Sequence, residues 1–132
     1  MIPDLQASVL CDDVRQERNG KFILIGLFDI VGLGDFPAVF QKLCVVNRWC
    51  CGEGEFKQQS RLVKPDDTVL VKGQDVAVKL PNTEAVATSV EFFLNVRFDT
   101  EGTYWVEIVL DGDLKLRYPL RVKKVVPRKR PE

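Results

Sequence analysis

The chain has 132 residues, of which 45% are hydrophobic and 29% charged, a composition typical of one soluble globular domain with a single core. Nineteen Lys and Arg residues balance nineteen Asp and Glu residues, so the chain lacks the global positive charge that collects nucleic acid. No apolar run approaches the roughly 18 residues that span a membrane and the N-terminus has no signal-peptide pattern, so we expect a cytoplasmic protein that does not bind membranes.

The predicted elements are β-strands, because apolar and polar residues alternate with period two and no helical period survives over ten residues. In chain order the strands are predicted over residues 7–15, 21–31, 41–51, 55–63, 68–71, 76–80, 88–98, 104–110 and 114–122. The pattern predicts an all-β, two-sheet antiparallel sandwich of about eight or nine strands with no long helix. Residues 1–126 are expected to form this single domain, and residues 127–132 a basic, disordered C-terminal tail.

Two of the predicted strands have an unusual composition. Residues 21–31 are apolar almost throughout, so we expect this strand to be buried on both faces or to lie at an edge that something else covers. Gly26 within it indicates a bulge or a close backbone approach. Residues 55–63 are mostly polar apart from Phe56, so we expect that strand near an edge of its sheet.

The segment 102–122 is predicted to form the hairpin that organises the fold, because apolar residues alternate along both of its strands. A two-residue turn at Asp111-Gly112 would pair Leu110 with Asp113 and bring charged residues onto the apolar face. We therefore predict a three-residue loop with a bulge, in which Gly112 takes the left-handed conformation. Alternation here and on the preceding strand predicts a core built from Val90, Phe92, Leu94, Val96, Tyr104, Val106, Ile108, Leu116, Tyr118 and Leu120.

The residues before Tyr104 resemble the start of the F strand in immunoglobulin-like domains. Asp99 and Gly102-Thr103 precede the tyrosine, as an acidic and a small residue do in that family, where the tyrosine hydroxyl bonds back to the backbone. Asp99 lies five residues before the tyrosine, where four is usual, and Val106 stands where antibody domains carry their second cysteine. The resemblance implies an immunoglobulin-like sandwich without the inter-sheet disulfide, and it implies no function.

The N-terminal half carries a second resemblance. Residues 10–17 (Leu-Cys-Asp-Asp-Val-Arg-Gln-Glu), followed by Asn-Gly-Lys at 19–21 and Leu-Ile-Gly at 24–26, are similar to the opening of an uncharacterised family of small bacterial proteins. Together with the Gly-x-Tyr hairpin, the similarity spans most of the chain. It implies a bacterial sandwich domain of unknown function and brings no catalytic residue with it.

No residue is predicted to be catalytic, and we expect a protein that is not an enzyme. The sequence contains no histidine, so the commonest general base is absent and a cysteine nucleophile lacks its usual partner. Cys11, Cys44, Cys50 and Cys51 do not have the spacing of a zinc site, so we expect free thiols and no cofactor. The basic residues 128–130 are expected to solvate the tail, so we expect no nucleic-acid partner.

Acidic turn residues leave a cation site open as an alternative. Calcium-binding sandwiches such as C2 domains gather acidic loops at one end, because the ion takes six to eight oxygen ligands. If the strands simply alternate in direction, five residues would gather in this way: Asp35, Asp66, Asp67, Asp111 and Asp113. No loop has a dense Asp-x-Asp-x-Asp pattern, and Asp is common in turns for its backbone hydrogen bonds, so the main prediction is no metal site.

A protein partner, or a second copy of the chain, is the favoured class of ligand. Trp105 and Val109 lie opposite Tyr104 on their strand, on a face that should meet solvent, so we predict that they anchor an interface. A homodimer could use that face or the edge of strand 21–31. The alternative for Trp105 is that a neighbouring loop or the N-terminal segment covers it. The function stays unknown, with a non-catalytic interaction or structural module favoured over a calcium- or ligand-binding sandwich.

Overall fold

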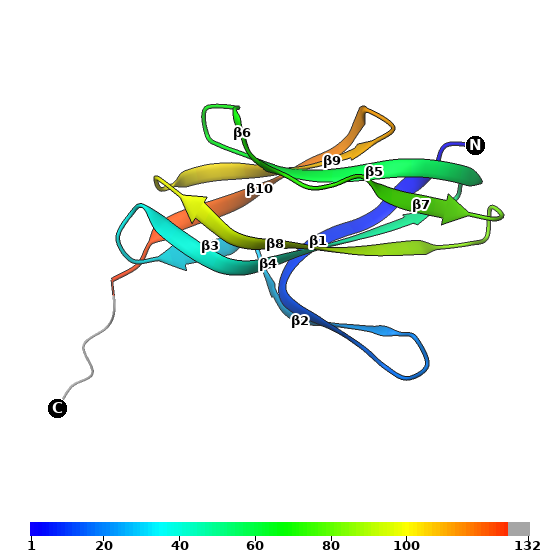
Figure 1. Ribbon diagram of the computed structural model, residues 1–132, viewed down its shortest axis with the longest axis horizontal. Helices are drawn as coiled ribbons and strands as arrows, with labels where there is room; N and C mark the ends of the chain where they lie inside the picture. Colours follow the sequence, from blue (N-terminus) through cyan, green and yellow to red (C-terminus); the bar gives the residue numbers. More distant parts are fainter. Residues whose placement is uncertain (127–132) are drawn as a thin grey trace.

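The computed structural model describes residues 1–126, and these form β-strands in two layers (Figure 1). The strands are β1 (Asp4–Gln16), β2 (Phe22–Phe28), β3 (Ile30–Leu33), β4 (Ala38–Cys50), β5 (Gly54–Val63), β6 (Val69–Lys72), β7 (Val76–Leu80), β8 (Ala87–Phe98), β9 (Gly102–Leu110) and β10 (Asp113–Lys124). The tail predicted over residues 127–132 lies outside the described residues. No helix within residues 1–126 is long and apolar enough to cross a membrane.

The two layers are sheets of four and six strands, so the predicted two-sheet sandwich is confirmed. The first sheet has the order β2-β1-β4-β8, and the second has the order β3-β10-β9-β5-β6 with β7 also paired to β5. All pairs are antiparallel except β3 with β10. The strand predicted over residues 21–31 is two strands, because the chain changes sheets at Asp29. Phe28 pairs with Leu10 in the first sheet, and Ile30 pairs with Arg121 in the second.

The core lies between the sheets and is built mainly from β4, β8, β9 and β10. Its largest fully buried side chains include Trp49, Phe98 and Ile108. The rings of Phe98 and Tyr104 meet edge to face with centroids 4.9 Å apart, an arrangement that aromatic pairs favour. Tyr104 Oη donates a hydrogen bond to the carbonyl oxygen of Thr100 at 2.8 Å, which confirms the backward bond expected from the sequence.

On β8 the predicted core face is wrong over its first half. Phe92 and Leu94 are 50% and 64% exposed, whereas Glu91 and Phe93 point into the sandwich. The strand changes face at Asn95, whose φ is 53°, so the predicted core residues Val96 and Phe98 beyond it are buried. Val90 packs in a separate cluster on the outer side of the sheet. Apolar alternation misassigned this strand because the inward set contains polar residues that find hydrogen-bond partners inside.

The β9–β10 loop also differs from the prediction. The turn has two residues, Asp111 and Gly112, with φ of 48° and 85°, and Leu110 pairs with Asp113. Positive φ at both central residues is the type I′ turn that matches the twist of a hairpin. A bulge between Leu114 and Leu116 then restores the register in which Tyr118 and Leu120 face the core. Leu116, predicted to be buried, is exposed beside this bulge.

Candidate interaction surface

The hairpin of β1 and β2 extends beyond the four-stranded sheet as an arm, which we define as residues 12–26. Strand β4 pairs with β1 as far as Cys11, opposite Cys44, whereas the pairing of β1 with β2 continues to Gln16 opposite Phe22. The hairpin is therefore only two strands wide beyond Cys11. Figure 1 shows it leaving the sandwich on the side of the four-stranded sheet that faces away from the other sheet.

The base of the arm is bent and tied to β4. Gly26 has a φ of 70°, and a Cβ there would collide with the Asp12 carboxylate, so the bend requires glycine. Lys42 Nζ donates to Asp13 Oδ1 at 2.7 Å. The hydrogen bond from Lys42 holds the pKa of Asp13 below its usual value, and the same contact raises the pKa of Lys42. This ion pair joins the arm to the strand beside it.

One side of the arm packs on the outer face of the four-stranded sheet. Cys11, Cys44 and Val46 are buried there, in a cluster separate from the main core. Val14 and Leu24, which pair across the arm, are among the residues that pack against this cluster. The arm therefore shields the middle of the outer face and leaves its two margins uncovered.

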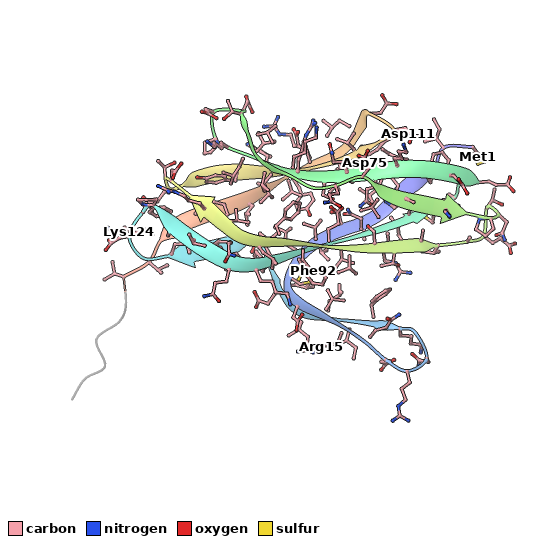
Figure 2. The ribbon with its side chains drawn as sticks, viewed as in Figure 1. Met1, Arg15, Asp75, Phe92, Asp111 and Lys124 are labelled. Carbon is pink, nitrogen blue, oxygen red and sulfur yellow. The ribbon has the colours of Figure 1, made fainter. Side chains whose placement is uncertain are left out.

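Large apolar side chains lie exposed at both margins and along the arm. The register aligns Leu27, Cys11, Cys44 and Phe92 in one row across the sheet. The ends of this row, Leu27 and Phe92, are 62% and 50% exposed, and Lys42 Nζ lies 5.0 Å from the centroid of the Phe92 ring. Figure 2 shows Phe92 on the side of the sheet from which the arm leaves, with Arg15 on the arm. We call the exposed apolar set on β2 and β8 the arm surface: Phe22, Ile23, Ile25, Leu27, Phe92 and Leu94.

Trp105 and Val109, the predicted interface anchors, lie on the outer face of the six-stranded sheet. Val109 is only 7% exposed. Trp105 is half-buried, with the guanidinium carbon of Arg117 4.5 Å from its ring centroid. Arg117 also pairs with Asp67 at 2.9 Å, and Glu107 beside it pairs with Arg61 at 2.7 Å. The Arg117 guanidinium thus covers part of the Trp105 ring, and the role of Trp105 and Val109 in an interface stays a prediction.

The acidic turn residues do not all meet at one end of the sandwich. On β5, Val63 pairs with Trp105 and Gln58 with Leu110, so the turns that follow Val63 and Leu110 lie at opposite ends of the sheet. Asp66 and Asp67 lie in the first of these turns, Asp111 lies in the second, and Asp113 directly follows it.

Each of several acidic side chains already has a partner. Asp66 accepts from the Thr68 backbone and hydroxyl, which lower the pKa of Asp66, and Asp111 accepts from the Lys57 backbone N–H at 2.8 Å. Asp35 lies 3.2 Å from Lys124 Nζ. Within residues 1–126 no three carboxylates or thiols form a group that could hold a metal ion.

The four cysteines are free thiols in the structure. Burial is the main cause that raises the pKa of Cys11, and it raises the pKa of Cys44 to about 11. Cys50 and Cys51 are neighbours at the end of β4 with sulfur atoms 3.6 Å apart, and the hydrogen bond between them raises the pKa of Cys50. A raised pKa keeps a thiol protonated at neutral pH and makes it a poor nucleophile.

A buried polar network between the sheets is the feature that the sequence did not predict. Trp49 Nε1 donates to Gln58 Oε1 at 2.6 Å, while Gln58 Nε2 and Ser60 Oγ donate to Glu91 Oε1 at 2.6 and 2.7 Å. Asn47 Nδ2 donates to Ser60 Oγ at 3.0 Å, and its own Oδ1 has no hydrogen-bond partner among the described residues. Burial raises the pKa of Glu91 despite the two hydrogen bonds that lower it.

This network corrects the predicted position of β5. The strand is internal to its sheet, paired with β9 on one side and with β6 and β7 on the other. Its polar residues Gln58 and Ser60 point inward, where they bond to Glu91 rather than to water. The polar composition of β5 therefore reflects buried side chains with hydrogen-bond partners, and not a position at the edge of the sheet. The available signal was a polar residue in each of two mostly apolar stretches, Asn47 and Glu91, together with Gln58 and Ser60 at alternate positions of a mostly polar strand.

None of the curated proteins compared with the chain matches it. The model of one family, described as "Family of unknown function (DUF6941)", matches residues 6–123. This range runs from β1 to β10 and contains both the arm and the buried polar network. The expectation that most of the chain belongs to an uncharacterised family is confirmed, and the protein is a member of the DUF6941 family of unknown function.

Proposed function

We propose that the protein is a non-catalytic module that associates with another copy of itself through the arm surface. The observation that carries this proposal is the exposure of six large apolar side chains on β2 and β8, on the arm and the sheet face next to it. Large apolar patches on soluble proteins mark sites of association. Leu27 and Phe92 share the outer face of the four-stranded sheet, since they end the row through Cys11 and Cys44, and the arm leaves from that face (Figure 2).

Several observations support a non-catalytic role. The chain lacks histidine, and the thiols of Cys11 and Cys44 are buried with raised pKa values. The buried carboxylate of Glu91 is held by Gln58 and Ser60 within the sandwich interior. Among the groups from which a nucleophile or a general base could be drawn, these three are engaged in packing or hydrogen bonding.

Charge favours a second copy over a strongly charged partner. The chain has equal numbers of acidic and basic residues. The arm surface itself has no charged member, and the charges beside it are of both signs: Asp13 pairs with Lys42 at 2.7 Å and with Arg15 at 3.0 Å. Two such surfaces can approach without the repulsion of like charges that would oppose self-association of an acidic or basic face. A closed two-fold dimer is the commonest assembly of identical chains.

Sedimentation equilibrium over a concentration series from about 1 μM to about 1 mM tests the proposal, since this range covers weak and moderate affinities. We expect a mass that rises from one chain to two. Leu27→Lys should weaken association by about 30-fold or more, as expected for a central interface residue. Trp105→Ala should leave the dissociation constant unchanged, because that residue lies on the other sheet. A parent protein that stays monomeric at the highest concentration contradicts the proposal, and loss of association only in Trp105→Ala would place the interface on the six-stranded sheet.

A further inference from the structure

Strand β2 is the edge strand of the four-stranded sheet, and its outer edge lacks charge and proline as protection, although Gly26 bends it. Among the described residues it pairs only with β1. Its sequence, Phe-Ile-Leu-Ile-Gly-Leu-Phe, contains no charged residue and no proline. Native proteins normally protect such an edge with lysine, proline, a bulge or an inward-pointing charge, because its unpaired backbone groups can template another strand.

The opposite edge of the same sheet shows what protection looks like in this molecule. Strand β8 points the charged residue Glu91 inward, and its backbone is interrupted at Asn95, where φ is 53°. Both features oppose the addition of a further strand. Strand β2 has a left-handed residue of its own, Gly26 with a φ of 70°, so what distinguishes the two edges is that β2 carries no charged residue.

A further strand beside β2 would also stabilise the arm. Beyond Cys11 it is a two-stranded ribbon, and an isolated two-stranded hairpin is only marginally stable in water. Val14 and Leu24 pack back onto the sheet, but Ile23 and Ile25 remain exposed. A strand added beside β2 would satisfy its free N–H and C=O groups and bury part of these isoleucine side chains.

The geometry points to a second copy of β2 as that strand: we infer that two chains pair their β2 strands antiparallel and join their four-stranded sheets into one continuous sheet of eight. This inference rests on the proposed self-association and specifies its mode. An antiparallel pair of identical strands is related by a two-fold axis, so the contact is the same on both chains and closes as a dimer. Because β2 is uncharged, no like charges are placed opposite one another within the pair.

The residues that flank β2 are compatible with this symmetric contact. Residues 12–21 carry three acidic side chains, Asp12, Asp13 and Glu17, and three basic ones, Arg15, Arg18 and Lys21. In an antiparallel pair the turn of each arm lies toward the far end of the partner's β2, so the two neutral arms do not repel one another. The arm surface residues Phe92 and Leu94 lie on the other margin of the sheet and are not required for this contact.

A matched pair of lysine substitutions tests the pairing. Ile25 on β2 and Ile30 on β3 are 44% and 42% exposed, so Ile25→Lys and Ile30→Lys add the same charge at similarly exposed sites on different sheets. Ile25 pairs with Asp13 on β1, which makes a lysine tolerable within its own hairpin. In sedimentation equilibrium we expect Ile25→Lys to raise the dissociation constant about 30-fold or more, and Ile30→Lys to dimerise like the parent protein.

Hydrogen exchange gives an independent measurement of strand pairing. Amides of β2 that point outward should exchange more slowly at concentrations where the parent protein is dimeric than where it is monomeric, and they should show no such change in Ile25→Lys. A thermal melt of each variant at low concentration confirms that the monomer fold is intact. If Ile25→Lys dimerises with the same dissociation constant as the parent protein, and the parent's β2 amides gain no protection on dimerisation, the strand pairing is overturned while self-association stands. A parent that never dimerises overturns both.

Discussion

Glu91 is a carboxyl group inside a β-sandwich, and its surroundings explain how it is tolerated there. Gln58 and Ser60 each donate a hydrogen bond to the same carboxylate oxygen, and a Cβ at Gly73 would lie 2.6 Å from the other oxygen. The β6–β7 connection therefore closes over the carboxyl group. Since burial disfavours the charged form more than the two hydrogen bonds favour it, the pKa of Glu91 is raised.

The raised pKa predicts a pH dependence of stability. The native state binds the Glu91 proton more tightly than the unfolded chain, so its contribution is fully present below the unfolded pKa and is lost as pH rises through the folded pKa. Glu91→Gln keeps an oxygen that accepts both hydrogen bonds and removes the ionisation. We therefore expect the stability of Glu91→Gln relative to the parent protein to increase from about pH 4 to about pH 8 in urea denaturation.

The exposed Glu55 supplies the control for this comparison. Glu55→Gln makes the same substitution at an exposed site on β5 and is measured beside Glu91→Gln over the same pH range. A Glu91→Gln protein whose stability relative to the parent falls as pH rises would show that the hydrogen bonds, and not burial, dominate the ionisation of Glu91.

Truncation of single apolar residues should separate the two faces of the sandwich. Ile108 is fully buried in the main core, whereas Leu94 is mostly exposed. Ile108→Ala should lower the free energy of unfolding by about 2–5 kcal/mol through lost burial and a residual cavity. Leu94→Ala should change it by no more than about 0.5 kcal/mol. Urea denaturation at a protein concentration below the dimer range measures both, and equal losses in the two variants would be inconsistent with the observed position of β8.

Among the elements, the β9–β10 hairpin shows how local backbone conformation and distant packing are reconciled. Asp111 and Gly112 form the tight turn that two-residue hairpins favour, although this turn places Asp113 opposite Leu110. The bulge after Leu114 corrects the phase, so Tyr118 and Leu120 still reach the core. The turn thus keeps its favoured geometry, and the later part of β10 still packs in the core. The residues of β10 that are out of phase with the core lie between the turn and the bulge, where they are exposed to solvent.

The turn requires a left-handed backbone conformation at Gly112, and the cost in stability of replacing this glycine can be measured. Its φ is 85° and no atom lies within 4 Å of a Cβ built there, so any cost of Gly112→Ala is a backbone cost. We expect a loss of about 1–2 kcal/mol. Gly34 is equally open but does not have a positive φ of this kind, so Gly34→Ala should be neutral or slightly stabilising. Indistinguishable melting temperatures for the two variants would count against the type I′ turn.

At the scale of the whole molecule, the thiols report on global unfolding. Cys11 and Cys44 are fully buried with raised pKa values, whereas Cys51 is exposed at the end of β4. A thiol reagent should label Cys51 of the native protein first and reach Cys11 and Cys44 only when the sandwich opens. Mass spectrometry of peptides after timed labelling measures this order, and four labels should appear after denaturation without reductant. Rapid labelling of Cys44 in native protein would show that the arm opens separately.

The immunoglobulin-like assignment also belongs to this scale and stays a prediction. The Tyr104 hydrogen bond to Thr100 and the division of the strands between two sheets support it. The additional edge strand β2 and its arm extend beyond the seven strands of a constant-type domain. The arm is therefore the part of the molecule that the sandwich architecture does not explain.

Local sequence alone was sufficient for the fold class, most strand positions and the inward face of β9, because alternation, turn residues and aromatic content are properties of neighbouring residues. The second half of β8, with Val96 and Phe98, was also assigned correctly. Sequence composition predicted that residues 21–31 are buried on both faces or covered at an edge, which is wrong for β2, where Phe22, Ile23, Ile25 and Leu27 are exposed. It could not show that the chain changes sheets at Asp29 and leaves β2 at an open edge.

Tertiary structure alone decided the features that depend on partners distant in the chain. Which face of β8 points inward depends on Gln58 and Ser60, which lie about thirty residues away and satisfy Glu91 inside the sandwich. Whether Trp105 is free depends on Arg117 across the hairpin, and whether Leu27 and Phe92 are exposed depends on where the arm leaves β4. The sequence shows which side chains are polar, but whether a side chain is buried depends on the partners that pack against it. Those partners come from distant parts of the chain and are determined only when the two sheets assemble.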